Sequence, residues 1–415
     1  MRGGLPGIAA SLAVLTLASC VTTVDSIGYN DVTGIHLQPV NGLPTYPNPF
    51  KDLDKSDADV ANKIAATFNQ LFYGDPNLQA IYVPTGADQA TILDTLHMDE
   101  RTEGIGLAMM IAVQLDKRSE FDRLWNYAVA MKKQKTGARR GYFESRCDTL
   151  ATTTIACDDP FGEAQMLTAL IFAHGRWTST SGPVDYEAGA LDLLYVMRHK
   201  QDENGGIVDD ITNTFDTTTA LPFHLPVVAA AGISRPSIVM PAYYDIWAQA
   251  TGDPFWTRAA AAGRSYWKAT AAHSADGLLP VRASFEGVPV LDWDTFDSES
   301  YRAQVNMAVD WAWARGARDP WQEEEANRLL KFFSRKGINV YGSSYTLDGA
   351  PIDTTRDFAL VAVNGVTGMV STNIDRAAYV NAVFDMATPS GPARYYSGIL
   401  QLTGLLILSG QYRIW

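Results

Sequence analysis

Apolar residues recur at helical spacing along most of this chain, and this periodicity limits the possible folds more than any other feature. Strand-like runs are few and short: residues 288–291, interrupted by Pro289, and Asn339–Tyr345. Helices in successive pairs, joined by long loops, predict an all-α ring of paired helices, an α/α toroid. No strict repeat is present, which disfavours a solenoid. The predicted helices are Val60–Phe72, Gly104–Leu115, Phe121–Met131, Gln165–Arg176, Glu187–Arg198, Pro236–Ala250, Pro254–Ala271, Tyr301–Ala314, Asp319–Phe333 and Tyr395–Leu408.

The predicted ring takes up most of the chain's 415 residues. No internal linker divides the sequence, so we expect one domain over residues 49–415. A core of this size needs neither a metal nor a disulfide framework for its stability. The formal net charge of −13 disfavours nucleic acid as a partner because phosphates would be repelled, whereas a neutral sugar is indifferent to it.

The first residues have the pattern of a targeting segment. Arg2 precedes the apolar run Ile8–Leu17, which is too short to span a bilayer as a helix and is typical of a signal peptide. Residues 17–20 resemble the lipobox of bacterial lipoproteins, in which the cysteine carries the lipid. We therefore expect a signal peptide over residues 1–19, a lipid on Cys20, a tether over residues 20–48 and a location in the bacterial cell envelope. An ordinary signal peptide that contains a cysteine is the alternative.

The two remaining cysteines, Cys147 and Cys157, flank a Thr-rich stretch that is predicted to be a loop. In an oxidising compartment they could form a local disulfide, and two unpaired thiols are the alternative.

Several common chemistries lack their residues in this sequence. The six histidines are scattered, and none forms a pair at metal-ligand spacing. The chain has no Gly-rich phosphate loop and no G-x-S-x-G motif. We therefore expect no metal and no cofactor, which leaves a chemistry of carboxylates on a helical frame.

Two carboxylates stand at notable places in the predicted helices. Glu103 opens an apolar helix, where it could also do no more than complement the helix dipole. Asp310 lies inside an otherwise apolar helical run, and charges in that setting are usually paired or functional. Asn306, one turn earlier, could orient Asp310. A buried Asp310 satisfied by Arg302 or by a backbone donor is the alternative.

The segments around Glu103 and Asp310 resemble the acid and base motifs of glycoside hydrolase family 8. The resemblance extends in the same order over nearly all of the chain after the tether. It is closest to the branch that contains reducing-end xylose-releasing exo-oligoxylanases. The other matching stretches are Phe121–Asn126, Pro241–Trp247, Tyr345–Gly349 and Arg394–Gly398, with the ending Ser409–Gly410.

The resemblance implies an (α/α)6 barrel and an inverting mechanism. Glu103 would protonate the glycosidic oxygen as general acid, and Asp310 would deprotonate the attacking water as general base. Such a pair needs carboxyl groups about 6.5–9.5 Å apart, so that a water fits between them. Glu103 would also need a raised pKa, which a desolvated cleft or a nearby carboxylate would have to supply.

The resemblance also points to side chains that bind sugar. Aromatic rings in the matched segments could stack on sugar faces, and packing in the core is the alternative for each of them. Arg302 would bind a sugar hydroxyl or hold Asp310, and an ion pair with another acid is the alternative. Arg101 is expected to be structural. The predicted sugar-binding residues are Trp125, Tyr244, Tyr301, Arg302, Tyr395 and Tyr396.

The chain departs from the pattern of that branch at two places. Phe161 stands where the branch has an Asp that binds sugar, and Leu107 and Ala108 replace the aromatic and the glycine that follow the acid motif. Three explanations are open: a different sugar, a neighbouring acid such as Asp159 in a substitute role, or a degenerate carbohydrate-binding lipoprotein. The retained Glu103 and Asp310 favour an enzyme.

The sequence thus predicts a monomeric, inverting hydrolase of β-linked neutral oligo- or polysaccharides. Xylo-oligosaccharide is the first expected substrate and β-1,4-glucan the second. Endo or exo action depends on loops that close one end of the cleft. Residues 353–358, where exo-acting relatives place such a loop, differ from theirs.

Overall fold

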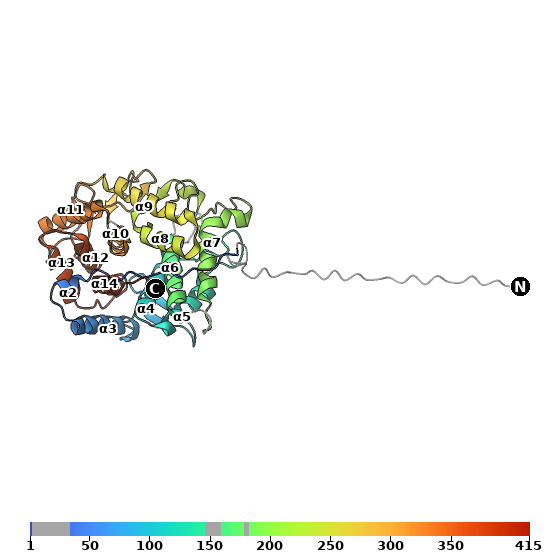
Figure 1. Ribbon diagram of the computed structural model, residues 1–415, viewed down its shortest axis with the longest axis horizontal. Helices are drawn as coiled ribbons and strands as arrows, with labels where there is room; N and C mark the ends of the chain where they lie inside the picture. Colours follow the sequence, from blue (N-terminus) through green and yellow to red (C-terminus); the bar gives the residue numbers. More distant parts are fainter. Residues whose placement is uncertain (2–33, 146–158, 178–181, 317) are drawn as a thin grey trace.

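The computed structural model describes residues 1, 34–145, 159–177, 182–316 and 318–415. The predicted signal peptide, the lipid site at Cys20 and the predicted Cys147–Cys157 bridge lie outside the described residues. Within the described part, the helices follow one another around a closed ring (Figure 1). No helix of the described part is both long and apolar enough to cross a membrane.

The ring has an inner and an outer layer. The inner helices contact one another in the order α4, α6, α8, α10, α12, α14 and back to α4, so that α10 lies across the ring from α4. Each is joined to an outer helix that is its neighbour in sequence. The inner helices are α4 (Thr102–Gln114), α6 (Pro160–Trp177), α8 (Pro241–Thr251), α10 (Arg302–Trp313), α12 (Phe358–Val370) and α14 (Arg394–Leu408). The outer helices are α3 (Asp57–Tyr73), α5 (Arg118–Tyr127), α7 (Tyr186–Asn204), α9 (Pro254–Ala271), α11 (Pro320–Lys336) and α13 (Arg376–Asp385), and α2 (Pro49–Asp52) is a short extra turn. The prediction of an (α/α)6 barrel is confirmed.

Local sequence signals explain where several helices begin. The Ser56 side chain accepts a hydrogen bond from the Asp59 amide at the start of α3. The Asp253 and Asp319 side chains cap α9 and α11 in the same way, each followed by a proline whose missing N–H needs no partner at that position. These caps fix the orientation of the outer helices.

The structure differs from the predicted elements in three respects. Helices α12 and α13 were not predicted; α12 is buried on all sides and so has no polar stripe to reveal its period. The predicted helix Pro236–Ala250 is a 3₁₀ turn, Pro236–Ile238, followed by α8. Residues 288–291 are not a strand, and only residues 344–345 of the predicted strand Asn339–Tyr345 are extended, at the start of β7.

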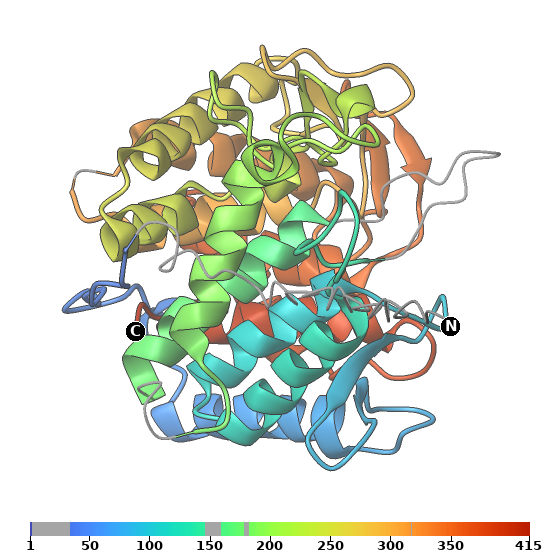
Figure 2. The ribbon, with the colours of Figure 1, turned by 90° about the vertical axis from the view of Figure 1, so that its right-hand side faces the viewer.

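Small antiparallel sheets lie at one end of the ring (Figure 2). β7 (Ser344–Thr346) pairs with both β6 (Thr295–Phe296) and β8 (Pro351–Asp353). The other pairings join β2 (Ala90–Asp94) to β1 (Tyr82–Pro84) and β3 (Asp99–Glu100), and β4 (Ile233–Ser234) to β5 (Ala283–Ser284). Because β3 leads directly into α4, this end carries the N-terminus of α4.

Residues 34–48 belong to the segment that was predicted to be a tether. They are irregular, as predicted, but they pack on the ring. The Gln38 amide donates to the Ala250 carbonyl at 2.7 Å, and the Leu37 amide donates to Glu187 Oε1 at 2.8 Å. Leu37 is buried in the core. The globular unit therefore includes residues from 34 onward, which corrects the predicted boundary at residue 49.

Candidate active site

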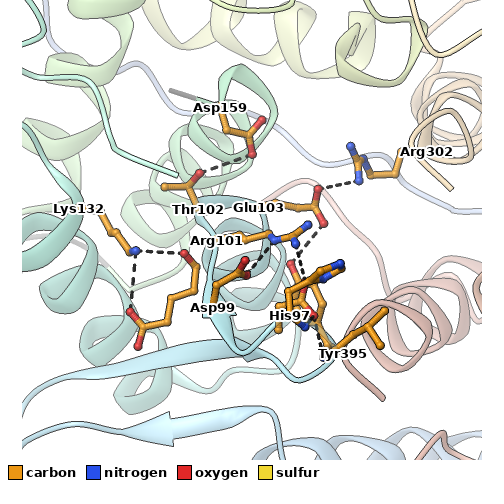
Figure 3. Close-up of polar contacts among 12 residues, drawn as sticks. His97, Asp99, Arg101, Thr102, Glu103, Lys132, Asp159, Arg302 and Tyr395 are labelled. Carbon is orange, nitrogen blue, oxygen red and sulfur yellow. Dashed lines mark hydrogen bonds and ion pairs between the residues drawn. The ribbon is translucent and has the colours of Figure 1, made fainter. Parts of the chain in front are cut away.

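Glu103 lies at the N-terminal end of the inner ring, where side chains from three helices meet. Arg302, at the start of α10, donates from Nη1 to Glu103 Oε2 at 2.7 Å. Tyr395, at the start of α14, donates from its hydroxyl to Glu103 Oε1 at 3.3 Å. Figure 3 shows both contacts converging on the Glu103 carboxyl group. The structure therefore brings together three residues that were predicted from the sequence.

Burial and charge act in opposite directions on Glu103. Burial raises the pKa of its carboxyl group above the ordinary value of 4.5, and the positive charge of Arg302 opposes that rise. The negative charge of Asp159, just before α6, raises the pKa further. The net rise favours the protonated form of the carboxyl group, which is the form that a general acid needs.

Arg302 is itself deeply buried, with 7% of its side chain exposed. Its guanidinium lies over the Phe161 ring, with Cζ 4.4 Å from the ring centroid, and Nη1 also donates to the Tyr396 hydroxyl at 3.4 Å. The Tyr396 hydroxyl in turn donates to the Ser298 carbonyl at 2.7 Å. The neighbouring acids raise the pKa of Arg302, so that its positive charge beside Glu103 is permanent.

Arg101 holds the chain that leads into α4. Its Nη2 lies 2.9 Å from Asp94 Oδ2, and its Nε donates to Asp99 Oδ1 at 3.0 Å. His97 Nδ1 lies 2.8 Å from the same Asp94 oxygen. These contacts fix the turn between β2 and α4 (Figure 3), as expected of a structural arginine.

Asp310 does not face Glu103. Its two oxygens receive hydrogen bonds from Arg264 of outer helix α9, at 2.6 and 3.0 Å, and Oδ2 also accepts from Gln322 of outer helix α11 at 2.8 Å. Arg264 is shared with Asp245, at 2.5 Å. The Asp310 carboxylate thus belongs to an ion-pair cluster between the two layers of the ring, in which Asp310 is buried whereas Arg264 and Asp245 are partly exposed.

The position of Asp310 along α10 leads to the same conclusion. It follows Arg302 by eight residues, which is a rise of about 12 Å in an α-helix. Val305, Asn306 and Val309 line the central cavity of the ring, whereas Asp310 is bound to the outer helices. The predicted general-base role of Asp310 is therefore corrected: both of its oxygens are occupied, and they point away from the site.

Three predicted sugar-binding aromatics are core residues. Trp125 is 7% exposed and packs against Phe143, with ring centroids 5.7 Å apart. Tyr244 is 1% exposed and packs against Phe215. Tyr301 is fully buried, and its hydroxyl donates to the Ser343 carbonyl. These three rings cannot stack on a sugar in this structure, so the alternative of core packing holds for them.

The two residues that depart from the family branch lie beside the site. Phe161 and Leu107 line a central cavity of about 20 Å³, together with Arg302. A cavity of this size holds about one water molecule. Phe161 is 1% exposed and Leu107 4% exposed, so both form an apolar floor beneath the Glu103–Arg302 pair.

The structure adds a carboxylate that sequence reasoning missed. Glu299 precedes α10 by one turn, on the same side of the ring as Arg302, and its negative charge raises the pKa of Arg302. Half of its side chain is exposed, and Oε2 lies 3.2 Å from Arg235 Nη1. The available signal was its position three residues before Arg302, in the polar run Ser298–Ser300.

Asp159 is a second carboxylate near Glu103, but its oxygens serve the helix start. Oδ1 accepts the Phe161 amide at 3.1 Å, and Oδ2 lies 3.5 Å from the Thr102 hydroxyl (Figure 3). Among the described residues, no three His, Cys, Asp or Glu side chains are grouped as metal ligands.

Comparison with known sequences identifies relatives along most of the chain. A sequence model of the family described as "Glycosyl hydrolases family 8" matches residues 92–410. The reducing-end xylose-releasing exo-oligoxylanase Rex8A of Paenibacillus barcinonensis is 33% identical over 89% of this chain and 97% of its own. An enzyme of the same description from Halalkalibacterium halodurans is 32% identical over 89% of this chain and 94% of its own. Endoglucanase C of Ruminiclostridium cellulolyticum is a more distant relative, 23% identical over 78% of this chain and 65% of its own.

Solved structures agree with these sequence matches. Rex8A in complex with xylose superposes with a TM-score of 0.80, at 34% identity, over 89% of this chain and 97% of that one. A GH8 xylobiose complex from Teredinibacter turnerae superposes with a TM-score of 0.81, at 30% identity, over 89% and 98% of the two chains. With an (α/α)6 ring, a buried glutamate at the N-terminal end of its inner helices and a family match that spans most of its length, this chain belongs to family 8 of the glycosyl hydrolases.

Proposed function

We propose that this glycosyl hydrolase cleaves β-linked xylo-oligosaccharides with inversion, using Glu103 as the general acid. The observation that carries the proposal is the buried Glu103 carboxyl group, which Arg302 and Tyr395 hold at the N-terminal end of the inner ring and whose raised pKa favours the protonated form. Xylo-oligosaccharide is preferred because the relatives at 32–33% identity are named for xylose release, whereas the endoglucanases are more distant. β-1,4-Glucan is the second candidate.

Glu299 is the proposed general base. It lies at the same end of the ring as Glu103 but comes from the turn that precedes the opposite helix, α10, as an acid and a base on two faces of one sugar require. Half of its side chain is exposed, so that a water molecule can reach it. Asp159 is less suited to this role because its oxygens are engaged at the start of α6.

In the proposed reaction Glu103 loses one proton and Glu299 gains one. Glu103 gives its proton to the glycosidic oxygen as the bond from that oxygen to the anomeric carbon breaks. Water attacks the anomeric carbon from the opposite face, and its proton passes to Glu299. The product therefore has the inverted anomeric configuration, and exchange with solvent restores both groups.

The test is a substrate series on the purified protein. Xylo-, cello- and chito-oligosaccharides are incubated with the protein and with Glu103→Gln, and proton NMR follows the anomer that is released first. We expect turnover of xylo-oligosaccharides with the inverted anomer, and a rate at least about 10³-fold lower in the variant. Turnover that survives in Glu103→Gln would contradict the assignment.

A non-hydrolytic sugar-binding protein is the alternative, and the apolar pair Phe161 and Leu107 is the observation that favours it. These residues replace polar groups at positions where the family branch grips its substrate. Isothermal titration calorimetry with the same oligosaccharides separates the two functions. Saturable binding without any product from any of the three series would support the alternative.

We further propose that the protein is a monomer, anchored through a lipid on Cys20 to the bacterial cell envelope. The support is the lipobox-like run of residues 17–20. Expression with Cys20→Ser tests it: the unaltered protein should partition with the membrane fraction, and the variant with the soluble fraction. Equal partition of the two would contradict the anchor, and light scattering of the soluble form gives the oligomeric state.

A further inference from the structure

Phe161 is the second residue of the inner helix α6. Its ring lies against the guanidinium of Arg302, which belongs to the inner helix α10. Arg302 Cζ is 4.4 Å from the ring centroid, within the range of a cation–π contact. Phe161 is 1% exposed and Arg302 is 6% exposed, so that water screens the contact little. A desolvated contact of this kind is among the stronger ones.

The guanidinium of Arg302 makes few hydrogen bonds that would fix its orientation. Arg302 Nη1 donates to Glu103 at 2.7 Å and makes a long bond to the Tyr396 hydroxyl at 3.4 Å. Arg302 Nε is buried and has no hydrogen-bond partner among the described residues. Of the two aromatic rings over the guanidinium, Phe161 is the nearer, since the Tyr396 ring centroid lies 5.9 Å from Cζ, and the Phe161 ring face therefore supports the plane of the guanidinium most closely.

Arg302 is also the group that most strongly opposes the rise in the pKa of Glu103. The charged or titratable groups that face the pair are Arg101 before α4, Asp159 before α6, Glu299 before α10, and Tyr395 and Tyr396 on α14. Of these, Arg101 opposes the rise less than Arg302 does, and the Tyr395 hydrogen bond less again. A small displacement of Arg302 would therefore change the protonation of Glu103.

We propose that Phe161 is a positioning residue that holds the Arg302 guanidinium against Glu103, and thereby sets the upper pH limit at which Glu103 keeps its proton. This role rests on the proposed function of Glu103 as the general acid. Phe161 thus acts through Arg302 and makes no contact with the reacting atoms.

The titration of Glu103 can be measured without any substrate. The infrared band of its protonated carboxyl group is identified by its loss in Glu103→Gln, and its amplitude is followed against pH. In Phe161→Leu, which keeps an apolar side chain but removes the ring face, Arg302 is released and the midpoint should move up by about one pH unit. Phe161→Tyr keeps the ring face and should titrate as the unaltered protein does.

The double variant Phe161→Leu with Arg302→Gln supplies the matched control. Because Phe161 acts through Arg302, Phe161→Leu should leave the midpoint unchanged in the Arg302→Gln background. An unchanged midpoint in Phe161→Leu alone, or an equal shift in both backgrounds, would overturn the proposal. Phe161→Met replaces the leucine variant if the latter does not fold.

Kinetics then separate this inference from the proposed function. If Glu103 is the acid, the alkaline limb of the kcat/KM profile should move with the infrared midpoint. An infrared shift without a matching kinetic shift would leave Phe161 as a positioning residue and remove Glu103 from catalysis. If neither the infrared midpoint nor the alkaline limb of kcat/KM moves in Phe161→Leu, and the two still coincide, Glu103 remains the acid and Phe161 is not a positioning residue.

Discussion

Burial of Glu103 disfavours its charged form, and the ion pair with Arg302 compensates for only part of that effect. The buried carboxyl group keeps a raised pKa although Arg302 lies 2.7 Å away. A fully paired carboxylate would have a lowered pKa and could not act as an acid near neutral pH. The residual rise is therefore the feature that suits Glu103 to proton donation.

The raised pKa has a consequence for stability. A carboxyl group whose pKa is higher in the folded than in the unfolded state stabilises the fold below the ordinary value of 4.5. That contribution is lost as pH rises from this value through the raised one. The free energy of unfolding of the protein, measured relative to that of Glu103→Gln, should therefore fall with rising pH in that window. Denaturant unfolding at a series of pH values measures it, and a difference that rises with pH would contradict the direction.

Asp310 shows how a buried carboxylate serves structure. Asp310→Asn leaves the Arg264 charge with only Asp245 as its partner. Because Asp310 is buried but Arg264 is 34% exposed, we expect the loss of these charged hydrogen bonds to destabilise the fold by about 1.5–3 kcal/mol. The folded fraction should keep most of its activity because Asp310 does not face the site. Asp385→Asn is the matched control: Asp385 is 67% exposed and pairs with Lys55 at 3.7 Å, so a change of less than about 1 kcal/mol is expected. Loss of activity in fully folded Asp310→Asn would contradict this structural role and support Asp310 as the general base.

At the scale of the elements, the close approach of α4 and α6 positions the site. A Cβ atom at Gly162 would lie 2.5 Å from the Thr102 carbonyl carbon and 2.7 Å from the Glu103 amide nitrogen. The backbone beside Glu103 therefore touches the first turn of α6, which carries Phe161. No residue larger than glycine fits at this contact without moving one helix.

Gly162→Ala should accordingly separate α4 from α6. We expect a loss of about 1–3 kcal/mol in stability, together with a fall in kcat, because Glu103 and Phe161 move apart. Gly404→Ala in α14 is the control, since a Cβ atom there would meet its nearest neighbour at an ordinary 3.4 Å. Thermal unfolding and steady-state rates measure both variants, and equal behaviour of the two would contradict the tight contact.

Helix bounds were predicted correctly where residues at the helix ends, such as a capping side chain or a first-turn proline, mark them. Pro254–Ala271 was predicted with the bounds that α9 has, since Asp253 and Pro254 mark its start. α12 was missed because almost all of its residues are buried, so that it shows no contrast between two faces.

The site was predictable only in part. Glu103, Arg302, Tyr395 and Tyr396 followed from the family resemblance, and the structure places them together. Asp310 was misassigned because sequence alone does not tell which side of an inner helix faces the cleft. Glu299 was overlooked since a half-exposed acid in a polar run looks like ordinary surface.

At the scale of the whole molecule, the C-terminal segment packs across the ring between distant helices. Gln114, at the end of α4, donates to the Arg413 carbonyl at 2.8 Å and accepts from the Trp415 indole at 2.8 Å. The Tyr412 hydroxyl lies 2.6 Å from that of Tyr243 on α8, and Ile414 is buried. The segment thus ties two inner helices together, α4 through Gln114 and α8 through Tyr243, and Tyr412 lines the same central cavity as Phe161 and Arg302.

Removal of residues 411–415 should therefore destabilise the whole ring. Loss of the buried Tyr412 and Ile414 side chains alone corresponds to about 3–6 kcal/mol. Arg413→Ala is the matched control, because its exposed side chain can be removed while the backbone contacts remain. Chemical denaturation compares the two variants, and a truncated protein as stable as the control would contradict this role.

Chemical rescue distinguishes the roles of Glu103 as the acid and Glu299 as the base. Azide attacks the anomeric carbon without losing a proton, so it should restore turnover in Glu299→Gln and not in Glu103→Gln. An aryl leaving group that departs without a proton should restore turnover in Glu103→Gln and not in Glu299→Gln. Rates of both variants with both reagents, on otherwise identical xylosides, complete the measurement. We expect rescue in these two combinations alone, and a Glu299→Gln variant that hydrolyses xylo-oligosaccharides at the full rate without azide would contradict the assignment of Glu299 as the base.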